Sequence, residues 1–349
     1  MTNREYKVRI EPYGRVILAS AERSVLDAAL SAGLNLPHSC KSGHCASCRA
    51  RLIAGDIHYP NGRTPGLTEQ EAKSGYILMC QARPRSDLTV EARLIANAGE
   101  VEIKTLPCRI AMMERLAPDV LQVFLRLPAV EPLRFQPGQY LDVLLDGGRR
   151  RSFSIASPPH DGDLIELHVR RVPGGGFSSA LFEQLRVGSL LRIEGPIGQF
   201  IYRENDAPAL MIAGGTGFAP LKSMLRHALE RGSHREIHVY WGARRAVDLY
   251  EEALMLEWVR QYPQLRFTAV LSEATAEEMA PSGEAPHRRM GWVHEAMMAD
   301  YPALDRYDVY AAGPPALIEA IRASFPARGV SEDRLHFDSF DYAPDSKPR

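Results

Sequence analysis

The sequence predicts a multidomain chain of α+β and α/β classes: a small β-rich domain, then an antiparallel β-barrel, then a parallel α/β domain. The length of 349 residues allows two or three domains. A first quarter with clustered cysteines gives way to short strands between glycine and proline turns, and then to strands that alternate with helices. We expect domains at residues 1–95, 105–204 and 205–349, with a linker at 96–104.

The composition excludes several classes of protein. A net charge of -1 leaves no basic footprint of the kind that nucleic-acid binding requires. No apolar run approaches the roughly 20 residues of a membrane helix. The start, Met1–Lys7, lacks the apolar core of a secretory signal. We therefore expect a cytoplasmic monomer with neither nucleic acid nor membrane as partner.

The first domain is expected to open with a hairpin, because Tyr6–Ile10 and Val16–Leu18 flank a Pro-Tyr-Gly turn. Ser24 then caps a short helix over Val25–Ala32. Three further strand-like stretches complete a compact β-rich unit, at residues 50–55, 76–79 and 87–92.

The second and third domains differ in how their strands are connected. The barrel strands are separated by turn residues and are expected at 121–127, 140–145, 165–170 and 190–194. In the third domain, alternation of strands and helices predicts βαβ units and a parallel sheet. Its strands are expected at 209–213, 237–241, 266–271 and 308–312, and its helices at 220–231, 249–261 and 315–325.

Four of the five cysteines lie in the first quarter of the chain. Cys40, Cys45 and Cys48 form a C-x4-C-x2-C loop, and Cys80 supplies a fourth thiol, which is the spacing of a plant-type [2Fe–2S] cluster. A structural zinc site would favour two CxxC-like pairs, and only one is present. A Rieske site would need two histidines in place of two cysteines, so we expect His38 and His44 to be solvated loop residues.

The fifth cysteine, Cys108, stands apart from this cluster in the sequence. A small buried hydrophobic residue is the simplest interpretation of it, because free cysteines are among the most buried residues.

Two segments of the barrel domain fit a flat, phosphorylated ligand. Arg151 offers a bidentate partner for a phosphate, and Phe153 offers a ring for stacking. Gly174–Ser179 enters a helix-like stretch, where free backbone N–H groups favour a diphosphate. A plain glycine loop and surface packing account for the same residues, so these segments alone leave flavin binding open.

A more specific pattern follows in the third domain. In Ile212–Pro220 an apolar strand enters a Gly-x-Gly turn, and a helix leaves it with Pro220 near the first turn. Ala311–Pro315 repeats the strand–turn–helix form. Both turns are expected at the carboxyl edge of a parallel sheet, where dinucleotides bind. A purely structural glycine turn is the alternative.

With these motifs in place, the chain resembles the ferredoxin–NAD(P)+ reductase superfamily, in the form that carries an N-terminal plant-type ferredoxin domain. The resemblance spans nearly the whole chain and is most specific in Arg151–Ser154, Gly195–Phe200, Gly214–Pro220 and Gly313–Pro315. It implies a β-grasp ferredoxin domain, an FAD-binding barrel and an NAD-binding α/β domain. Within the family, Arg192–Pro196 and Ala213–Met224 look particularly like the glucoseen reductases.

The resemblance also implies a role for each matching residue. The cluster ligands would be Cys40, Cys45, Cys48 and Cys80. FAD would be bound by Arg151, Phe153, Ser154, Gly175, Gly176 and Ser178, with Ser154 near the reactive nitrogen and Phe340 shielding the ring as the second catalytic residue. The nicotinamide dinucleotide would be bound by Gly215, Thr216, Gly217, Gly313 and Pro314.

Two residues depart from the family pattern, since Phe153 replaces the usual tyrosine and Ala312 replaces the usual cysteine before Gly-Pro. Both replacements are expected to affect the rate of hydride transfer, and neither removes a cofactor. After the strand that ends near Trp241, the sequence looks like the NADH-using members. Arg244 and Arg245 could instead accept the 2′-phosphate of NADPH.

This cofactor set implies an electron relay. NADH yields two electrons together as hydride, a [2Fe–2S] cluster accepts one, and a flavin can take the pair and release single electrons. The expected order is NADH to FAD to [2Fe–2S] to a one-electron protein acceptor. We weigh a glucoseen-type reductase that serves a dehydrase, a reductase component of a multicomponent oxygenase or hydroxylase, and a non-catalytic redox-sensing module.

Overall fold

The computed structural model describes residues 4–38, 41, 43–44, 46–62, 64–94, 103–162, 164–279 and 287–340. The chain separates into two compact units, Met1–Glu100 and Val101–Arg349. The predicted linker at 96–104 lies mostly outside the described residues, and its last residue, Lys104, already belongs to a strand of the second unit.

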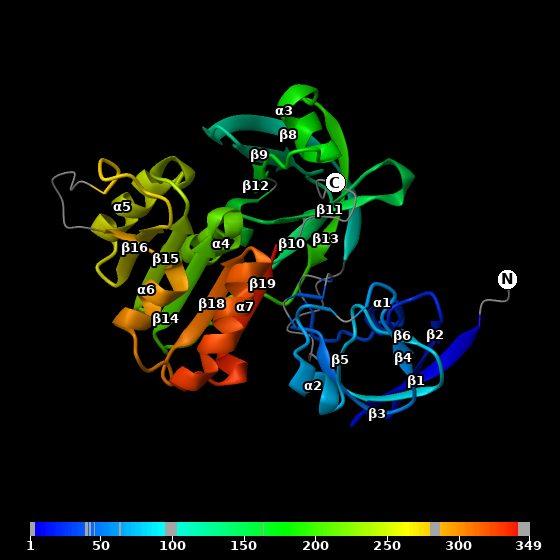
Figure 1. Ribbon diagram of the computed structural model, residues 1–349. Helices are drawn as coiled ribbons and strands as arrows, with labels where there is room; N and C mark the ends of the chain where they lie inside the picture. The colour runs from blue at the N-terminus through cyan, green and yellow to red at the C-terminus, as the bar shows by residue number, and fades with distance from the viewer. Residues whose placement is uncertain are drawn as a thin grey trace. The chain divides into compact units, whose positions relative to one another are not determined.

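The first unit is a mixed five-stranded sheet with a helix packed against it, a β-grasp arrangement (Figure 1). Strands β1 and β7 pair in parallel at the centre, and the remaining pairs are antiparallel. The elements are β1 Glu5–Glu11, β2 Arg15–Ser20, α1 Val25–Ser31, β3 Arg49–Ala54, β4 Ile57–His58, α2 Glu69–Lys73, β5 Tyr76–Leu78, β6 Arg83–Pro84 and β7 Leu88–Glu91.

Helix α1 begins where the sequence predicts. The side chain of Ser24 accepts a hydrogen bond from the Asp27 backbone N–H, which satisfies one of the free amides of the first turn. One face of the helix is apolar, and Val25, Leu26 and Ala29 are fully buried in the core of this unit. This packing fixes the helix across the sheet.

The second unit begins with a six-stranded antiparallel barrel in the order β11-β10-β13-β8-β9-β12. An isolated antiparallel bridge between Ile155 and Leu167 joins the two ends of this order and closes the barrel. Its elements are β8 Lys104–Ala117, β9 Val120–Arg126, β10 Tyr140–Leu144, β11 Arg150–Ser154, β12 Leu164–Arg170, α3 Gly176–Glu183 and β13 Leu190–Ile197.

The remainder of the second unit is a six-stranded sheet in the order β17-β16-β15-β14-β18-β19, in which every pair is parallel. The order runs outward in both directions from β14, so β14 and β18 flank the switch point at which ligands bind in such sheets. The elements are β14 Ala209–Gly214, α4 Phe218–Glu230, β15 Ile237–Ala243, α5 Glu252–Gln261, β16 Leu265–Leu271, β17 Arg288–Met290, α6 Val293–Asp300, β18 Asp308–Gly313, α7 Pro315–Ser324 and β19 Leu335–Ser339.

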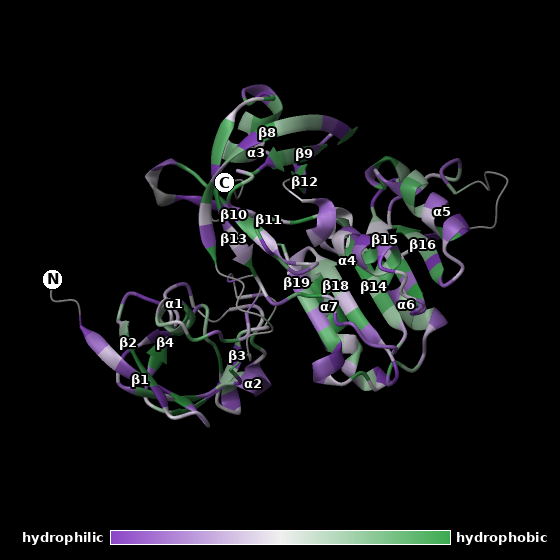
Figure 2. Cartoon of the chain, turned by 180° about the vertical axis from the view of Figure 1, so that it is seen from behind, coloured by the Kyte–Doolittle hydropathy of each residue, from purple (hydrophilic) through white to green (hydrophobic). Residues whose placement is uncertain are grey.

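Both faces of the parallel sheet are covered, which explains why its strands are almost continuously apolar (Figure 2). Helices α4 and α5 contribute to the core on one face, and α6 and α7 to the core on the other. The predicted strands and the helices near 220–231, 249–261 and 315–325 are confirmed. Helix α6 and strands β17 and β19 were not predicted.

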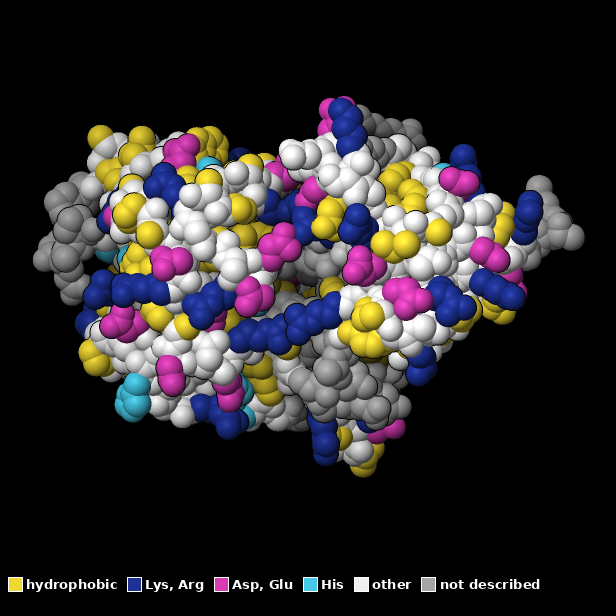
Figure 3. Space-filling model, turned by 90° about the horizontal axis from the view of Figure 1, so that it is seen from below, with side chains coloured by type: hydrophobic (Ala, Val, Ile, Leu, Met, Phe, Trp, Pro, Cys, Tyr) yellow, Lys and Arg dark blue, Asp and Glu magenta, His cyan; other side chains and the backbone are white. Residues whose placement is uncertain are grey.

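The surface agrees with the near-zero net charge. Basic and acidic side chains are interspersed over the face drawn in Figure 3. Among the described residues, no helix combines the length and the apolar character needed to cross a membrane.

Candidate functional site

The predicted nucleotide turn lies at the carboxyl end of β14, at the switch point of the sheet. Gly215 has a left-handed backbone (φ 55°), which favours glycine. A Cβ atom on Gly217 would come within 2.0 Å of the Ala312 carbonyl oxygen, so only glycine allows this turn to pack against β18. Within the described residues, no side chain caps the amides at the start of α4. These amides are suitably placed to bind a phosphate.

Arg170 is a site residue that sequence reasoning missed. Its guanidinium lies beside the turn, 3.9 Å from the position that a Cβ atom of Gly215 would occupy. Its Nε and Nη2 atoms are buried and have no hydrogen-bond partner among the described residues. Unpaired buried donors beside a phosphate-binding turn fit an anionic ligand. The sequence shows only that a basic residue, Arg170, ends a barrel strand, and this signal is too weak to identify a binding residue.

The two predicted flavin segments lie together. Arg151 and Phe153 are on β11, and Gly175 and Gly176 lie at the start of α3. The rings of Phe153 and Phe177 pack with centroids 5.7 Å apart, which holds α3 against the strand. The first turn of α3 has no side-chain cap within the described residues. A phosphate could therefore bind its free amides.

Ser178 has a structural contact in addition to its predicted role. Its Oγ accepts a hydrogen bond from the Val172 backbone N–H at 3.1 Å. This bond holds the glycine turn closed at the beginning of α3.

Ser154 contacts the strand that ends just before Phe340. The Ser154 Oγ donates a hydrogen bond of 3.3 Å to Asp338 on β19. The Phe340 backbone N–H donates to the Gly313 carbonyl at 2.9 Å, which places this aromatic residue beside the second predicted nucleotide turn. Asp338 is 4% exposed, and the sequence analysis did not identify it. The end of β11, the end of β19 with Phe340, and the end of β18 are thus connected by hydrogen bonds.

The cysteine loop is only partly described, because Cys40 and Cys45 lie outside the described residues. Cys48 and Cys80 are both buried. The Met79 backbone N–H donates to the Cys48 carbonyl at 3.1 Å, so the segments that carry the two thiols are adjacent. Lys41 and Ala46 have left-handed backbones, with φ of 51° and 56°. Such strain at non-glycine residues is typical of a loop shaped around a ligand.

One expectation about this loop was wrong. His38 is 4% exposed rather than solvated, and burial lowers its pKa to about 4. Its Nδ1 is 2.8 Å from the Leu36 carbonyl oxygen. The burial of Cys108 is confirmed, and burial raises its thiol pKa to about 12.

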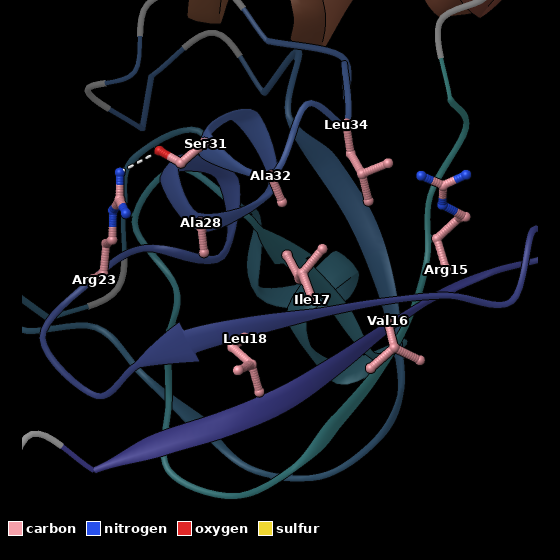
Figure 4. A pocket seen from close by; sticks show the side chains of 9 residues that line it. All are labelled: Arg15, Val16, Ile17, Leu18, Arg23, Ala28, Ser31, Ala32 and Leu34. Atoms are coloured by element: carbon pink, nitrogen blue, oxygen red, sulfur yellow. Dashed lines mark hydrogen bonds between the residues drawn. The ribbon is translucent and has the colours of Figure 1, made fainter.

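A cavity of about 410 Å³ opens in the first unit between β2 and α1 (Figure 4). Its lining includes the apolar side chains of Val16, Leu18 and Leu34 and the basic side chains of Arg15 and Arg23. None of the predicted site residues is part of its lining, so we assign it no role in electron transfer.

Comparison with protein families gives one match for each predicted domain. Residues 8–85 match a 2Fe-2S iron-sulfur cluster binding domain. Residues 107–202 match an oxidoreductase FAD-binding domain, and residues 211–323 match an oxidoreductase NAD-binding domain. The matches follow one another along the chain in the predicted order.

Relatives match the chain over almost its whole length. The CDP-6-deoxy-L-threo-D-glycero-4-hexulose-3-dehydrase reductase of Yersinia pestis is 35% identical, over 95% of this chain and 98% of the relative. Reductase component 2 of a terephthalate 1,2-dioxygenase from Comamonas is 36% identical, over 92% and 93%. The crystal structure of the Amycolatopsis cytochrome P450 reductase GcoB has a TM-score of 0.74 and 33% identity, over 96% and 98%.

Proposed function

The chain belongs to the ferredoxin–NAD(P)+ reductase superfamily, in the form with a 2Fe-2S domain, and we propose that it is a CDP-6-deoxy-Δ3,4-glucoseen reductase. It is an NAD(P)H-dependent oxidoreductase with FAD and a [2Fe–2S] cluster as cofactors. Its acceptor would be a pyridoxamine-phosphate iron–sulfur dehydrase that acts on a CDP-6-deoxyhexulose. The full-length similarity to the Yersinia pestis reductase supports this proposal, and the resemblance of Arg192–Pro196 and Ala213–Met224 to the glucoseen reductases favours it over other members of the family.

A second candidate is the reductase component of an oxygenase. The terephthalate dioxygenase reductase of Comamonas has nearly the same identity to this chain, so overall similarity does not separate the two acceptors. The two candidates share the electron path and differ only in the protein that receives the electrons.

Reconstitution separates the candidates. The purified chain, NADH and a CDP-6-deoxyhexulose dehydrase are combined anaerobically with the dehydrase substrate, and the deoxygenated sugar is measured. A parallel assay supplies a dioxygenase oxygenase component and its aromatic substrate. We expect turnover with the dehydrase, and turnover confined to the oxygenase would contradict the proposal.

The cofactor sites follow the residues described above. In our assignment Cys40, Cys45, Cys48 and Cys80 hold the cluster through four thiolates. The flavin site comprises Arg151, Phe153, Ser154, Gly175, Gly176 and Ser178, with Phe340 covering the ring. The dinucleotide site comprises Arg170, Gly215, Thr216, Gly217, Gly313 and Pro314. Two observations on the described part of the chain support these assignments: Nε and Nη2 of Arg170 have no hydrogen-bond partner there, and no side chain there caps the first amides of α3 and α4.

The protein's part in the reaction is to bind and orient its ligands. Bound flavin supplies the chemistry that accepts a hydride and releases single electrons. Arg151 and the start of α3 hold the phosphates of FAD, and the turn at Gly215–Gly217 holds the dinucleotide. Ser154, whose O–H is donated to Asp338, would lie beside the flavin ring with its oxygen as a hydrogen-bond acceptor, and Phe340 would keep water away from the ring. Holding both reactants in one orientation removes much of the entropic barrier.

We also propose that NADH is preferred over NADPH. Arg245 follows β15, where the adenosine ribose of a dinucleotide binds in such sheets. Its Nε donates to both carboxylate oxygens of Glu278, at 3.1 and 2.9 Å. Hydrogen bonding from the Thr275 backbone, together with Arg245, lowers the pKa of Glu278 to about 2. The pairing withdraws one cation that a 2′-phosphate would need.

A further inference from the structure

A buried cluster of charges links the barrel to the parallel sheet. Lys222 on α4 is 5% exposed, and its Nζ donates to Glu166 on β12 at 2.8 Å. The same Nζ donates to Glu251, the residue before α5, at 2.5 Å. Burial alone would raise the pKa of Glu166, but His168 and Lys222 outweigh it and hold that pKa well below its usual range. Glu166 is therefore a buried carboxylate whose charge depends on these partners.

The cluster extends to His168 and Tyr250. His168 on β12 contacts Glu166 through Nε2 at 2.9 Å and the Tyr250 hydroxyl through Nδ1 at 3.0 Å. Glu166, His168 and Glu251 are close enough together to hold a metal ion. A divalent cation there would meet the ammonium of Lys222, so we interpret the cluster as an ion network rather than a metal site.

On its barrel side, the cluster holds the residues that follow the flavin strand. The Ala156 backbone N–H donates to the Glu166 carbonyl at 2.8 Å. The Glu166 backbone N–H donates to the Ser157 Oγ at 3.1 Å. The bridge between Ile155 and Leu167 lies beside them. The chain just after Ser154 is thus fixed to the strand that carries Glu166.

On its other side, the cluster holds the helix that follows the nucleotide turn. Helix α4 begins at Phe218, directly after Gly217, and Lys222 is in its second turn. The next residue, Ser223, is fully buried and donates from Oγ to the Ser157 carbonyl at 2.7 Å. Two consecutive residues of α4 therefore bond to the barrel: Lys222 pairs with Glu166 on β12, and Ser223 donates to Ser157 just after the flavin segment.

We propose that Lys222 is a positioning residue for hydride transfer. Its ion pairs with Glu166 and Glu251 fix α4, and with it the nucleotide turn, against the segment that follows Ser154. The nicotinamide is thereby held at the distance from the flavin that the reaction requires. The inference rests on the proposed flavin and dinucleotide sites and adds a residue that contacts neither ligand.

The test measures hydride transfer in single-turnover reactions of the whole FAD-loaded protein with NADH under anaerobic conditions. In Lys222→Gln, we expect flavin reduction to slow by at least about fivefold, while the dissociation constant for NADH changes by less than about threefold. Lys222→Arg keeps the charge and should restore most of the rate. If Lys222 had only a structural role, Lys222→Gln would lower the FAD content of the protein. It would not slow flavin reduction while leaving the affinity for NADH unchanged.

Arg226→Gln is the matched control. Arg226 lies on the same helix and also links it to the barrel, through Asp161 at 2.6 Å, but this pair is partly exposed. Its loss should leave the rate within about twofold of wild type. A rate in Lys222→Gln that falls by less than about fivefold, or an equal loss in Arg226→Gln, would overturn the proposal.

If Lys222→Gln fails to fold, Ser223→Ala is measured against the same threshold of about fivefold for flavin reduction. This variant removes the hydrogen bond from Ser223 to the Ser157 carbonyl and leaves no buried charge unpaired. The wild type reports separately on the proposed function. If NADH does not reduce its flavin, the assigned sites are wrong. If NADH does reduce it and the variants behave like wild type, only the role of Lys222 is wrong.

Discussion

The Ser154 hydroxyl on β11 donates a 3.3 Å hydrogen bond to the Asp338 carboxylate on β19. This bond joins the last residue of the flavin strand to the final strand of the parallel sheet. The relationship gives Ser154 a fixed orientation, which a freely rotating hydroxyl would lack.

Removing the Ser154 hydroxyl should slow hydride transfer. We expect Ser154→Ala to lower the rate of flavin reduction by NADH by about tenfold, equivalent to ~1.4 kcal/mol of barrier, with FAD still bound. Ser152→Ala is the control, because Ser152 is on the same strand but donates to Asp142 instead. Equal rates in the two variants would remove Ser154 from the site.

Arg151 is expected to anchor FAD by its phosphate. Arg151→Ala should release flavin, and the ratio of FAD to protein in the purified variant should fall by at least about half. Arg150→Ala is the neighbouring control, since Arg150 pairs with Glu194. The ratio is read from the flavin absorbance. Full occupancy in Arg151→Ala would show that another group holds the phosphate.

Cys48 tests the order of the relay. Cys48→Ser should abolish electron transfer to a protein acceptor, because a cluster ligand is lost, but should keep NADH-driven reduction of a small dye by the flavin. Cys108→Ala should retain both activities, since Cys108 is buried in the barrel core. Loss of dye reduction in a folded, FAD-loaded Cys48→Ser protein would mean that the cluster precedes the flavin.

Glu278 is expected to weaken the use of NADPH. Glu278→Ala frees Arg245, so kcat/KM for NADPH should rise by about fivefold relative to that for NADH. Glu277→Ala is the control, because Glu277 is exposed and, among the described residues, the carboxylate that pairs with Arg245 is that of Glu278. Steady-state assays with both nucleotides give the ratio. An unchanged ratio in Glu278→Ala would argue against a role for the Arg245–Glu278 pair.

His238 makes stability depend on pH. Burial lowers its pKa in the folded chain to about 4, against roughly 6.5 when unfolded. The unfolded chain therefore takes up the proton first. The free energy of unfolding should decline as pH falls from roughly 6.5 to about 4, by at most ~1.4 kcal/mol per pH unit.

Urea denaturation followed by tryptophan fluorescence at about pH 7 and about pH 5 measures this dependence. His238→Gln should reduce the difference between the two conditions, whereas His234→Gln, at an exposed position, should not. The same dependence in both variants would assign it to other groups.

Sequence patterns predicted the local features well. The Ser24 cap, the Gly215–Gly217 turn and the burial of Cys108 each depend on residue type and on near neighbours, which a sequence displays directly. Strand β19 was missed because Asp338 and Ser339 have low strand propensity and the strand forms only through its parallel pairing with β18.

Contacts distant in sequence were not predictable. Ser154 and Asp338 are 184 residues apart in the sequence, and Lys222 and Glu166 are 56 residues apart. Nothing local distinguishes Lys222 from an exposed helical lysine, or Arg170 from its neighbour Arg171. Only the closed barrel, packed beside the parallel sheet, brings these side chains to the site.

The most direct test of the account is the order in which the two redox centres are reduced. The FAD-loaded protein is mixed anaerobically with NADH, flavin absorbance is followed in time, and samples are frozen for EPR of the cluster. The account predicts that flavin absorbance falls first, that the reduced-cluster signal follows, and that Cys48→Ser loses only the second phase. A cluster signal that rises before the flavin is reduced would contradict it.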